Sequence, residues 1–442
     1  MTRKITTRRG VGVVGDLRIV DLAGALLFAL LLVENCLQSK VWGPAAYIDE
    51  LSALIFAFLA LRKIVGGHSS LWLSLEDKLL IAGCFFLMGI GFLGNVVSSF
   101  QSVWSAVAID FFTCLKFFIA FLSLKILNDH GVSHTLLSLC VGIGKAYIIV
   151  MMICLVADQV VGIGMTTETR FGIRNFVFFF AHPSNFSASI VGLLALLMMD
   201  RRSNRFYIVC CFILLFFTTR YKAIAFAGII LVTLFVFSRT NRITVSFVFL
   251  ALICAVVLAA DQITTYYFSG NETARAALLD RSMSIANWLF PLGSGFGTYG
   301  CEVSKTAYTS LYYLFGLNLI YGLTPSDPAY LADMFWPTVI AQFGWIGFAT
   351  YLVMVIVFVK GVASDARRSK CFFWAAMAIP IYLLVTSTSE PSFFSSYAVY
   401  LAFCLVLVAR GHLGVSLQEL DASIDERRLR GDIRPAIKLL KD

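Results

Sequence analysis

The sequence predicts an all-α membrane protein that crosses the bilayer many times. Of its 442 residues, 59% are hydrophobic and only 14% are charged, and the mean hydropathy is +0.84. Apolar runs of about 18 residues or more, the length that spans hydrocarbon as a helix, recur throughout the chain. A membrane β-barrel would instead show short segments of alternating polarity. These observations together favour a polytopic helical fold.

Twelve transmembrane spans fit the hydropathy pattern. The segment before the first span is basic and lacks a small-residue cleavage site, so we expect a retained span and not a cleaved signal. The seventh and eighth spans are short for a bilayer. The expected spans are residues 20–36, 45–61, 79–98, 103–122, 135–157, 186–199, 206–218, 223–238, 243–261, 336–359, 371–387 and 393–409.

The distribution of the 35 Lys and Arg residues orients these spans. Placing both termini in the cytoplasm puts most basic residues on the inner side, as the positive-inside rule requires. This placement also explains the net charge of +9 without nucleic acid as a partner. We therefore expect one transmembrane domain over residues 1–410 and a cytoplasmic C-terminal tail over residues 411–442.

The eleven cysteines do not indicate a metal site. Most of them lie inside apolar runs, where a thiol behaves as a small hydrophobic group. The sequence has no Cys-x-x-Cys pair and no paired Cys and His spacing, so we predict no bound metal. Cys36 and Cys301 fall near the expected outer face, and a disulfide between them is an open alternative to two free thiols.

Three of the expected outer loops are candidates for function: residues 158–185, the tight turn at 219–222 and a large periplasmic loop at 262–335. Loops as long as the last one usually carry function. Within it, residues 271–290 are expected to form a helix. The aromatic run 308–323 suits a helix lying at the membrane interface.

Seven basic residues stand in these three loops, although outer loops are normally poor in Lys and Arg. A guanidinium group pairs bidentately with phosphate oxygens, so arginines at headgroup depth suit a lipid-linked pyrophosphate. Solvated loop charges or snorkelling side chains are the alternative interpretation. Two of the arginines are six residues apart on an expected helix, about 240° around it, so at most one is expected to point into a given site. The seven are Arg170, Arg174, Arg220, Lys222, Arg275, Arg281 and Lys305.

Other polar residues share this outer layer. His182 precedes a proline at the start of the sixth span, where it is either structural or a general base. Asn185 either caps that helix or binds a sugar hydroxyl. Asp333, with Asp327 before it, either caps the tenth span or lines a site. Glu390 in the last outer turn is a further acid candidate.

Four segments of the chain resemble one known family. The run PLGSGFGTYG (291–300) has glycines that permit tight turns, but it lacks the strand and helix that a nucleotide-binding motif requires. With HPSNF (182–186), TTRYKA (218–223) and DMFWPTVIAQFGWIG (333–347), and with Arg281 before the glycines, it resembles the O-antigen polymerase and ligase superfamily of bacterial surface-polysaccharide assembly.

The sequence departs from the pattern of that superfamily at two places. Gln342 stands where the family usually has Glu, and Tyr221-Lys222 stands where a small residue usually follows the arginine. Ligases of the family depend on a histidine in the large outer loop, and residues 262–335 contain none. The resemblance therefore favours a polymerase over a ligase.

The resemblance implies a glycosyltransferase of the GT-C type in the bacterial inner membrane. Such a polymerase of O-antigen or exopolysaccharide transfers the growing glycan from undecaprenyl diphosphate onto a lipid-linked repeat unit at the periplasmic face. It needs no metal or other cofactor, because the undecaprenyl-diphosphate-linked oligosaccharide is already activated. A partner that regulates chain length is also implied.

The residues expected to carry this reaction fall into three groups. Cations hold the departing diphosphate, with Arg220, Arg281 and Arg170 expected first and Lys222, Arg174 and Arg275 next. The base that deprotonates the acceptor hydroxyl is expected to be His182 or Asp333. The glycan is expected to contact Asn185, Tyr221 and Asp327.

Two alternatives stay open. One is an O-antigen ligase of the same superfamily, which transfers glycan to a lipid A core. The other is a flippase or transporter of lipid-linked glycan, because Asp110, Lys116 and Lys145 are charges within expected spans. For these charges, a buried ion pair between helices is the structural alternative. No repeat between two halves of the chain is evident, so the one-sided large loop favours an enzyme.

Overall fold

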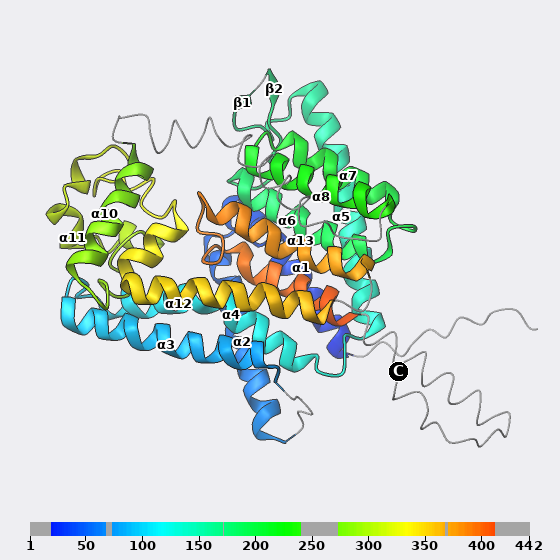
Figure 1. Cartoon of the computed structure of the whole chain (residues 1–442). Helices are drawn as coiled ribbons and strands as arrows, with labels where there is room; N and C mark the ends of the chain where they lie inside the picture. Colours follow the sequence, from blue (N-terminus) through cyan, green and yellow to red (C-terminus); the bar gives the residue numbers. More distant parts are fainter. Residues whose placement is uncertain (1–18, 68–72, 171, 240–272, 367–369, 412–442) are drawn as a thin grey trace, which may run out of the picture.

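In the residues that the computed structural model describes, the regular elements are helices and one short hairpin (Figure 1). The structure describes residues 19–67, 73–170, 172–239, 273–366 and 370–411. Within these ranges, seven helical segments are long and apolar enough to cross a membrane. Their helices are α1 (Ile19–Lys40), α2 (Ile48–Val65, preceded by the 3-10 helix η1, Gly43–Tyr47), α3 (Leu75–Ser98), α4 (Trp104–Leu127), α5 (His134–Val161), α6 (Pro183–Leu197, extended by η2, Met198–Asp200) and α12 (Phe335–Asp365).

Four shorter apolar helices complete the part of the bundle that the structure describes. They are α7 (Arg205–Phe217), α8 (Tyr221–Arg239), α13 (Lys370–Ser387) and the helix Tyr397–Gly411. Each coincides with an expected span, so the predicted helical fold is confirmed, and the apolar helices are compatible with a chain embedded in a membrane. The ninth expected span, residues 243–261, lies outside the described residues, and the count of twelve stays a prediction.

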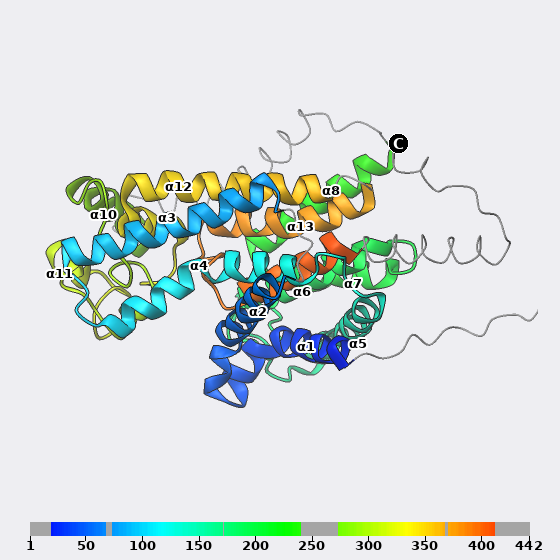
Figure 2. The same ribbon diagram turned by 90° about the horizontal axis from the view of Figure 1, so that it is seen from below.

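The centre of the bundle is formed by helices that are buried on most sides. Most of α6 and of the helix Tyr397–Gly411 is buried, as expected for helices without a polar face. Gly192 of α6 lets the two approach closely, because a Cβ there would lie 2.5 Å from the ring of Tyr400. Around this centre, α3 runs beside α12, and α2 beside α4 (Figure 2).

The two lysines that the sequence places within spans have partners on neighbouring helices. Lys116 of α4 lies 2.6 Å from Asp49 and 2.9 Å from Glu50, both of α2. Lys145 of α5 stands 5.3 Å from the ring centre of Tyr207 on α7, a cation–π contact. These contacts agree with the structural interpretation of the intramembrane lysines, so a transport path is not needed to explain their charges.

The large loop between α8 and α12 has a small hydrophobic core of its own. Leu278 and Ile285 of α10 (Ala274–Trp288) pack with Tyr299 and Tyr312, which stack with ring centres 5.5 Å apart. This region lies at the left of Figure 1, at the end of α3 and α12. Besides α10 it contains η4 (Glu302–Lys305), α11 (Ser310–Leu314) and η5 (Leu317–Leu319).

The structure corrects one expectation for the large loop and decides one for the cysteines. The aromatic run 308–323 is not one interfacial helix, because α11 ends after five residues and Gly316 adopts φ +68°, which a helix cannot continue. Cys36 and Cys301 are both free thiols. Their side chains instead face Tyr147 and Ser304.

Candidate functional site

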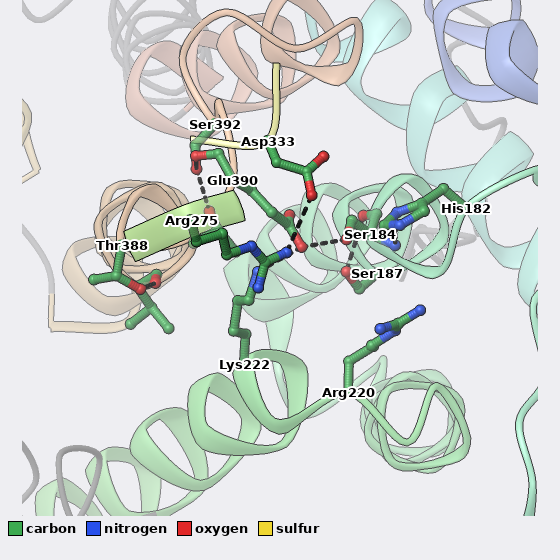
Figure 3. A network of polar contacts seen from close by, with 12 residues as sticks. His182, Ser184, Ser187, Arg220, Lys222, Arg275, Asp333, Thr388, Glu390 and Ser392 are labelled. Carbon is green, nitrogen blue, oxygen red and sulfur yellow. Dashed lines mark hydrogen bonds and ion pairs between the residues drawn. The ribbon is translucent and has the colours of Figure 1, made fainter. Parts of the chain in front are cut away.

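Charged side chains from several separate segments meet where α7 and α13 end and where α6, α8 and α12 begin (Figure 3). Glu390, Arg220, Asp333 and Lys222 all act electrostatically on His182. Lys222 in turn lies in the field of Glu390, Arg275 and Arg220. We call these residues, with Glu168 and Arg170 at their edge, the outer-end cluster. The structure thus brings together most of the cations that the sequence singles out.

Glu390 is at the centre of the outer-end cluster. It stands in the turn between α13 and the helix Tyr397–Gly411, where its backbone N–H donates to the carbonyl of Thr386 at 2.9 Å. Its Oε1 accepts from Lys222 Nζ at 2.6 Å and from the hydroxyl of Ser184. The side chains of Glu390 and Lys222 are 16% and 19% exposed, so a small ligand group can reach both.

The ionisation of Glu390 depends on its partners. Burial by itself favours the neutral acid, but the ammonium of Lys222 and the hydroxyl of Ser184 outweigh it and hold the pKa of Glu390 below its ordinary value. Glu390 is therefore a carboxylate while Lys222 stays beside it. If that cation moves away, burial is the main remaining influence, and the carboxylate becomes a stronger proton acceptor.

A strained turn places Arg220 and Lys222. Thr219 adopts φ +53°, an uncommon value for a residue with a branched side chain, and the Thr218 hydroxyl accepts from Arg220 N at 3.3 Å. Because α8 begins directly afterwards, at Tyr221, the turn is as short as the sequence predicts. It leaves both cations at the helix ends and not within the apolar layer.

Glu168 joins two of the arginines. Its Oε2 lies 2.9 Å from Arg170 Nε and its Oε1 lies 2.8 Å from Arg220. Arg170 is in the hairpin formed by β1 (Thr169–Arg170) and β2 (Ile173–Arg174). All three side chains are about a third exposed, which is the environment of an exchangeable ion pair.

The large loop contributes a further ion pair to the outer-end cluster. Arg275, in the first turn of α10, reaches Asp333 at 3.3 Å. In Figure 3 its guanidinium group lies between Asp333 and Glu390. Asp333 does not cap α12, because the N-cap residue there is Met334, without a side-chain cap. Of its two predicted roles, the structure therefore agrees with lining the site.

His182 has a structural role, which bears on its predicted role as a general base. It is the N-cap of α6, and its Nδ1 accepts from Ser184 N at 3.3 Å, while Pro183 occupies the first helical position. The neutral ring therefore carries its proton on Nε2 and acts as a donor. Partial burial, helped by Arg220 and Lys222, lowers the pKa of His182, so the ring is neutral at pH 7. This arrangement favours orienting a hydroxyl or phosphate over accepting a proton.

Two predicted diphosphate ligands have other partners. Arg174 donates to the carbonyl of Asp158 at 2.8 Å, where it closes the C-terminal end of α5. Arg281 pairs at 2.9 Å with Asp280, its neighbour on α10. Arg275, and not Arg281, is thus the α10 arginine that joins the outer-end cluster, as their opposite positions around the helix allow.

The predicted glycan contacts are spread over a wider area. Asn185 donates to the side chain of Asn35 at 2.9 Å and does not cap α6. Tyr221 is half-buried at the start of α8, next to Lys222. Asp327 is exposed in a turn, where its backbone N–H donates to the Thr324 hydroxyl at 3.0 Å. Among these three, Tyr221 is adjacent in the chain to the outer-end cluster.

Most of the glycine run 291–300 is buried between α3, α4 and α12, from Gly293 to Gly300. A Cβ on Gly295 would lie 2.4 Å from the backbone nitrogen of Asn95, so only glycine fits. The Asn95 side chain holds Phe296 through two hydrogen bonds of 2.8 Å. Asp110 accepts from Gly297 N at 2.7 Å. The run thus anchors the large loop in the bundle. The polar backbone groups of Phe296 and Gly297 named above are bound by protein side chains.

Gln342, one of the two departures from the family pattern, binds this glycine run. Its side-chain Nε2 donates to the backbone carbonyl of Tyr299 over 3.0 Å. Its backbone carbonyl accepts from Gly295 N at 2.8 Å. A carboxylate could not donate the first of these bonds, so the amide at this position holds the glycine run in place.

An apolar groove of about 480 Å³ lies between α3 and α12 and does not include the outer-end cluster. Its walls come from the lipid-facing sides of the two helices. The lining residues are Leu79, Gly83, Phe86, Trp345, Ile346, Ala349, Thr350, Val353, Met354 and Val357.

The sequence did not identify two members of the site. Glu168 and Ser184 hold Arg220 and Glu390, respectively, yet each looks like an ordinary loop or helix-start residue in the sequence. Their only sequence signal is proximity to predicted residues, Glu168 to Arg170 and Ser184 to His182.

No known protein-family model matches the sequence, and no curated protein matches it either.

Proposed function

We propose that the chain is a membrane glycosyltransferase that polymerises a bacterial surface polysaccharide, O-antigen or exopolysaccharide. Its donor is a glycan on undecaprenyl diphosphate, and its acceptor is a lipid-linked repeat unit at the periplasmic face of the inner membrane. One observation supports this most: Arg170, Arg220, Lys222 and Arg275 gather at the ends of apolar helices. A diphosphate at headgroup depth needs such a group of cations.

The charges of the outer-end cluster suit exchange with an anionic ligand. Its four cations face three carboxylates, Glu168, Asp333 and Glu390. Partly exposed ion pairs contribute little to stability, so breaking them costs little. Phosphate oxygens offer the same cations shorter, bidentate contacts. A diphosphate therefore replaces the carboxylates as partner of the cations.

This exchange also supplies a base. When Lys222 turns to the diphosphate, Glu390 keeps Ser184 but loses its cation, and its affinity for a proton rises. Glu390 then takes the proton of the acceptor hydroxyl as that oxygen bonds to the anomeric carbon. The bond from the anomeric carbon to the phosphate oxygen breaks, and undecaprenyl diphosphate leaves with its charge stabilised by the cations.

His182 and Asp333 have supporting roles in this mechanism. The Nε2–H of His182 is the donor that the ring offers to a ligand, because Nδ1 is engaged by α6. Asp333, released from Arg275 in the same exchange, is the second carboxylate that a sugar hydroxyl can contact. We therefore propose Glu390 as the base in place of His182 and Asp333. Of the two carboxylates, Glu390 is more buried than Asp333.

The test is reconstitution of the purified protein with lipid-linked repeat units in liposomes. A ladder of products supports the polymerase, and its loss in Arg220→Ala and Arg275→Ala ties the activity to the cluster. A single transfer to lipid A core would identify a ligase, and movement of the lipid without bond formation would identify a flippase. Lys305→Ala is the matched control, because Lys305 pairs locally with Glu302 at 2.8 Å.

A further inference from the structure

The helical layer contains two buried lysines with carboxylate partners, and the two groups differ in their charge balance. Lys125 of α4 lies 2.8 Å from Asp77 and 2.9 Å from Asp365. The other oxygen of Asp77 accepts from the backbone N–H of Ser74 at 3.2 Å. In this group one ammonium serves two carboxylates, one of them 29% exposed.

The second group has one more acid. Lys116 pairs with Asp49 and Glu50 of α2, and α1 adds Glu34 (α1, α2 and α4 lie together in Figure 2). Glu34 is 1% exposed, and neither of its carboxylate oxygens has a hydrogen-bond donor among the described residues. The charged groups that act on it are Asp49, Lys116 and Glu50. Both oxygens of Asp49 accept hydrogen bonds, Oδ2 from Lys116 at 2.6 Å and Oδ1 from the backbone N–H of Glu50 at 2.8 Å.

Charge balance decides what joins these acids. Three carboxylates and one ammonium would leave two uncompensated negative charges in a layer of low dielectric. A buried carboxyl group that has no donor of its own and lies near other carboxylates holds a proton, because a further charge there is too costly. We propose that Glu34 holds a proton beside Asp49, so that this pair is a proton-binding site inside the membrane domain.

The proton site is next in the chain to a residue that contacts the outer end of the bundle. Asn35, the neighbour of Glu34, accepts from Asn185 and from Ser396, each at 2.9 Å. Asn185 directly follows Ser184, a partner of Glu390. Hydrogen bonds of the residue next to Glu34 thus join α1 to the start of α6, near the outer-end cluster. The proposal stands independently of the proposed enzymatic function.

Infrared spectroscopy of the purified full-length protein tests the proton directly. At pH 7 we expect a carbonyl band of a protonated carboxyl group that shifts in D₂O and disappears in Glu34→Gln. Asp365→Asn is the matched control, because it removes an acid from the Lys125 group, in which both carboxylates pair with the ammonium, and should keep the band. Absence of the band in the wild type, or its persistence in Glu34→Gln, would overturn the proposal.

A second measurement needs no variant. Dicyclohexylcarbodiimide adds to protonated carboxyl groups in apolar surroundings, so mass spectrometry should find the adduct on the peptide that contains Glu34. Labelling should slow as the pH rises. If sodium chloride, compared with choline chloride at equal ionic strength, abolishes both labelling and the infrared band, the acids hold a metal cation and the proton assignment is wrong.

Discussion

The outer-end cluster and the glycine run 291–300 are both polar, yet they use their polar groups differently. In the cluster, ion pairs such as Lys222–Glu390 and Arg275–Asp333 join segments at the surface of the bundle and remain partly exposed. In the glycine run, Asn95 and Gln342 bind backbone groups and are buried. Fixed, buried hydrogen bonds position the chain, whereas exposed ion pairs can exchange partners. We therefore place chemistry in the first region and architecture in the second.

The largest expected effect is on the glycine run. Gly295→Ala puts a Cβ against the backbone of Asn95 at a residue with φ +89°, so both overpacking and backbone strain apply. We expect a loss of about 3 kcal/mol or more in folding stability. Yield and thermal unfolding in detergent measure it. Gly142→Ala, a helical position with open space around it, is the control and should behave like the wild type. Equal yield and thermal unfolding of the two variants would contradict an architectural role of the glycine run.

The next effect separates activity from stability in the outer-end cluster. Arg220→Ala and Arg275→Ala should each lower the polymerisation rate about 100-fold or more, because each removes a cation from the departing diphosphate. Thermal unfolding should change little, since these ion pairs are partly exposed. Arg281→Ala should retain activity. A variant set in which only Arg281→Ala is inactive would show that the cluster is not the site.

Replacing the proposed base should lower the reaction rate by a similar factor but should not weaken donor binding. Glu390→Gln should lower kcat by about 100-fold or more while leaving donor binding intact or tighter, because Lys222 no longer has a competing carboxylate. Single-turnover rates and donor binding measure the two quantities separately. Asp333→Asn is the comparison, and a larger kcat loss there would make Asp333 the base.

The effect expected from His182 is smaller and depends on pH. Its folded-state pKa is below the ordinary value, so the unfolded chain binds a proton first and stability falls as the pH drops below about 6.5. His182→Asn keeps an N-cap acceptor for α6 and should remove this pH dependence. His182→Ala should cost about 1 kcal/mol through the lost cap. Unfolding curves between about pH 5 and 8 test both; an unchanged pH dependence in His182→Asn would contradict the titration of this ring.

The sequence was sufficient for the helices and for two of the cations in the outer-end cluster, Arg220 and Lys222. Long apolar runs predicted the helical segments because hydropathy is a local property. Arg220 and Lys222 were found because charge beside hydrocarbon is costly and therefore informative. Glu390, the partner of Lys222, is 168 residues away from it along the chain, and no local pattern predicts such a pairing.

Other features depended on tertiary packing. The choice of Arg275 over Arg281 follows from how α10 is rotated, which the sequence restricts to one of the two but does not decide. The run 308–323 looked helical from its apolar residues, but Gly316 and packing against the small core of the large loop divided it into short turns. The cap of α6 is His182 and not Asn185, whose side chain binds Asn35.

Binding of undecaprenyl diphosphate to the purified protein tests the central claim most directly. Native mass spectrometry in detergent, with undecaprenyl phosphate as the weaker ligand, compares the wild type with Arg220→Ala, Arg275→Ala and the control Lys305→Ala. We predict that the two cluster variants lose about tenfold or more in affinity, because each loses a charge-assisted contact to phosphate, while the control binds like the wild type. Equal affinity in all four proteins would contradict a diphosphate site at the outer-end cluster.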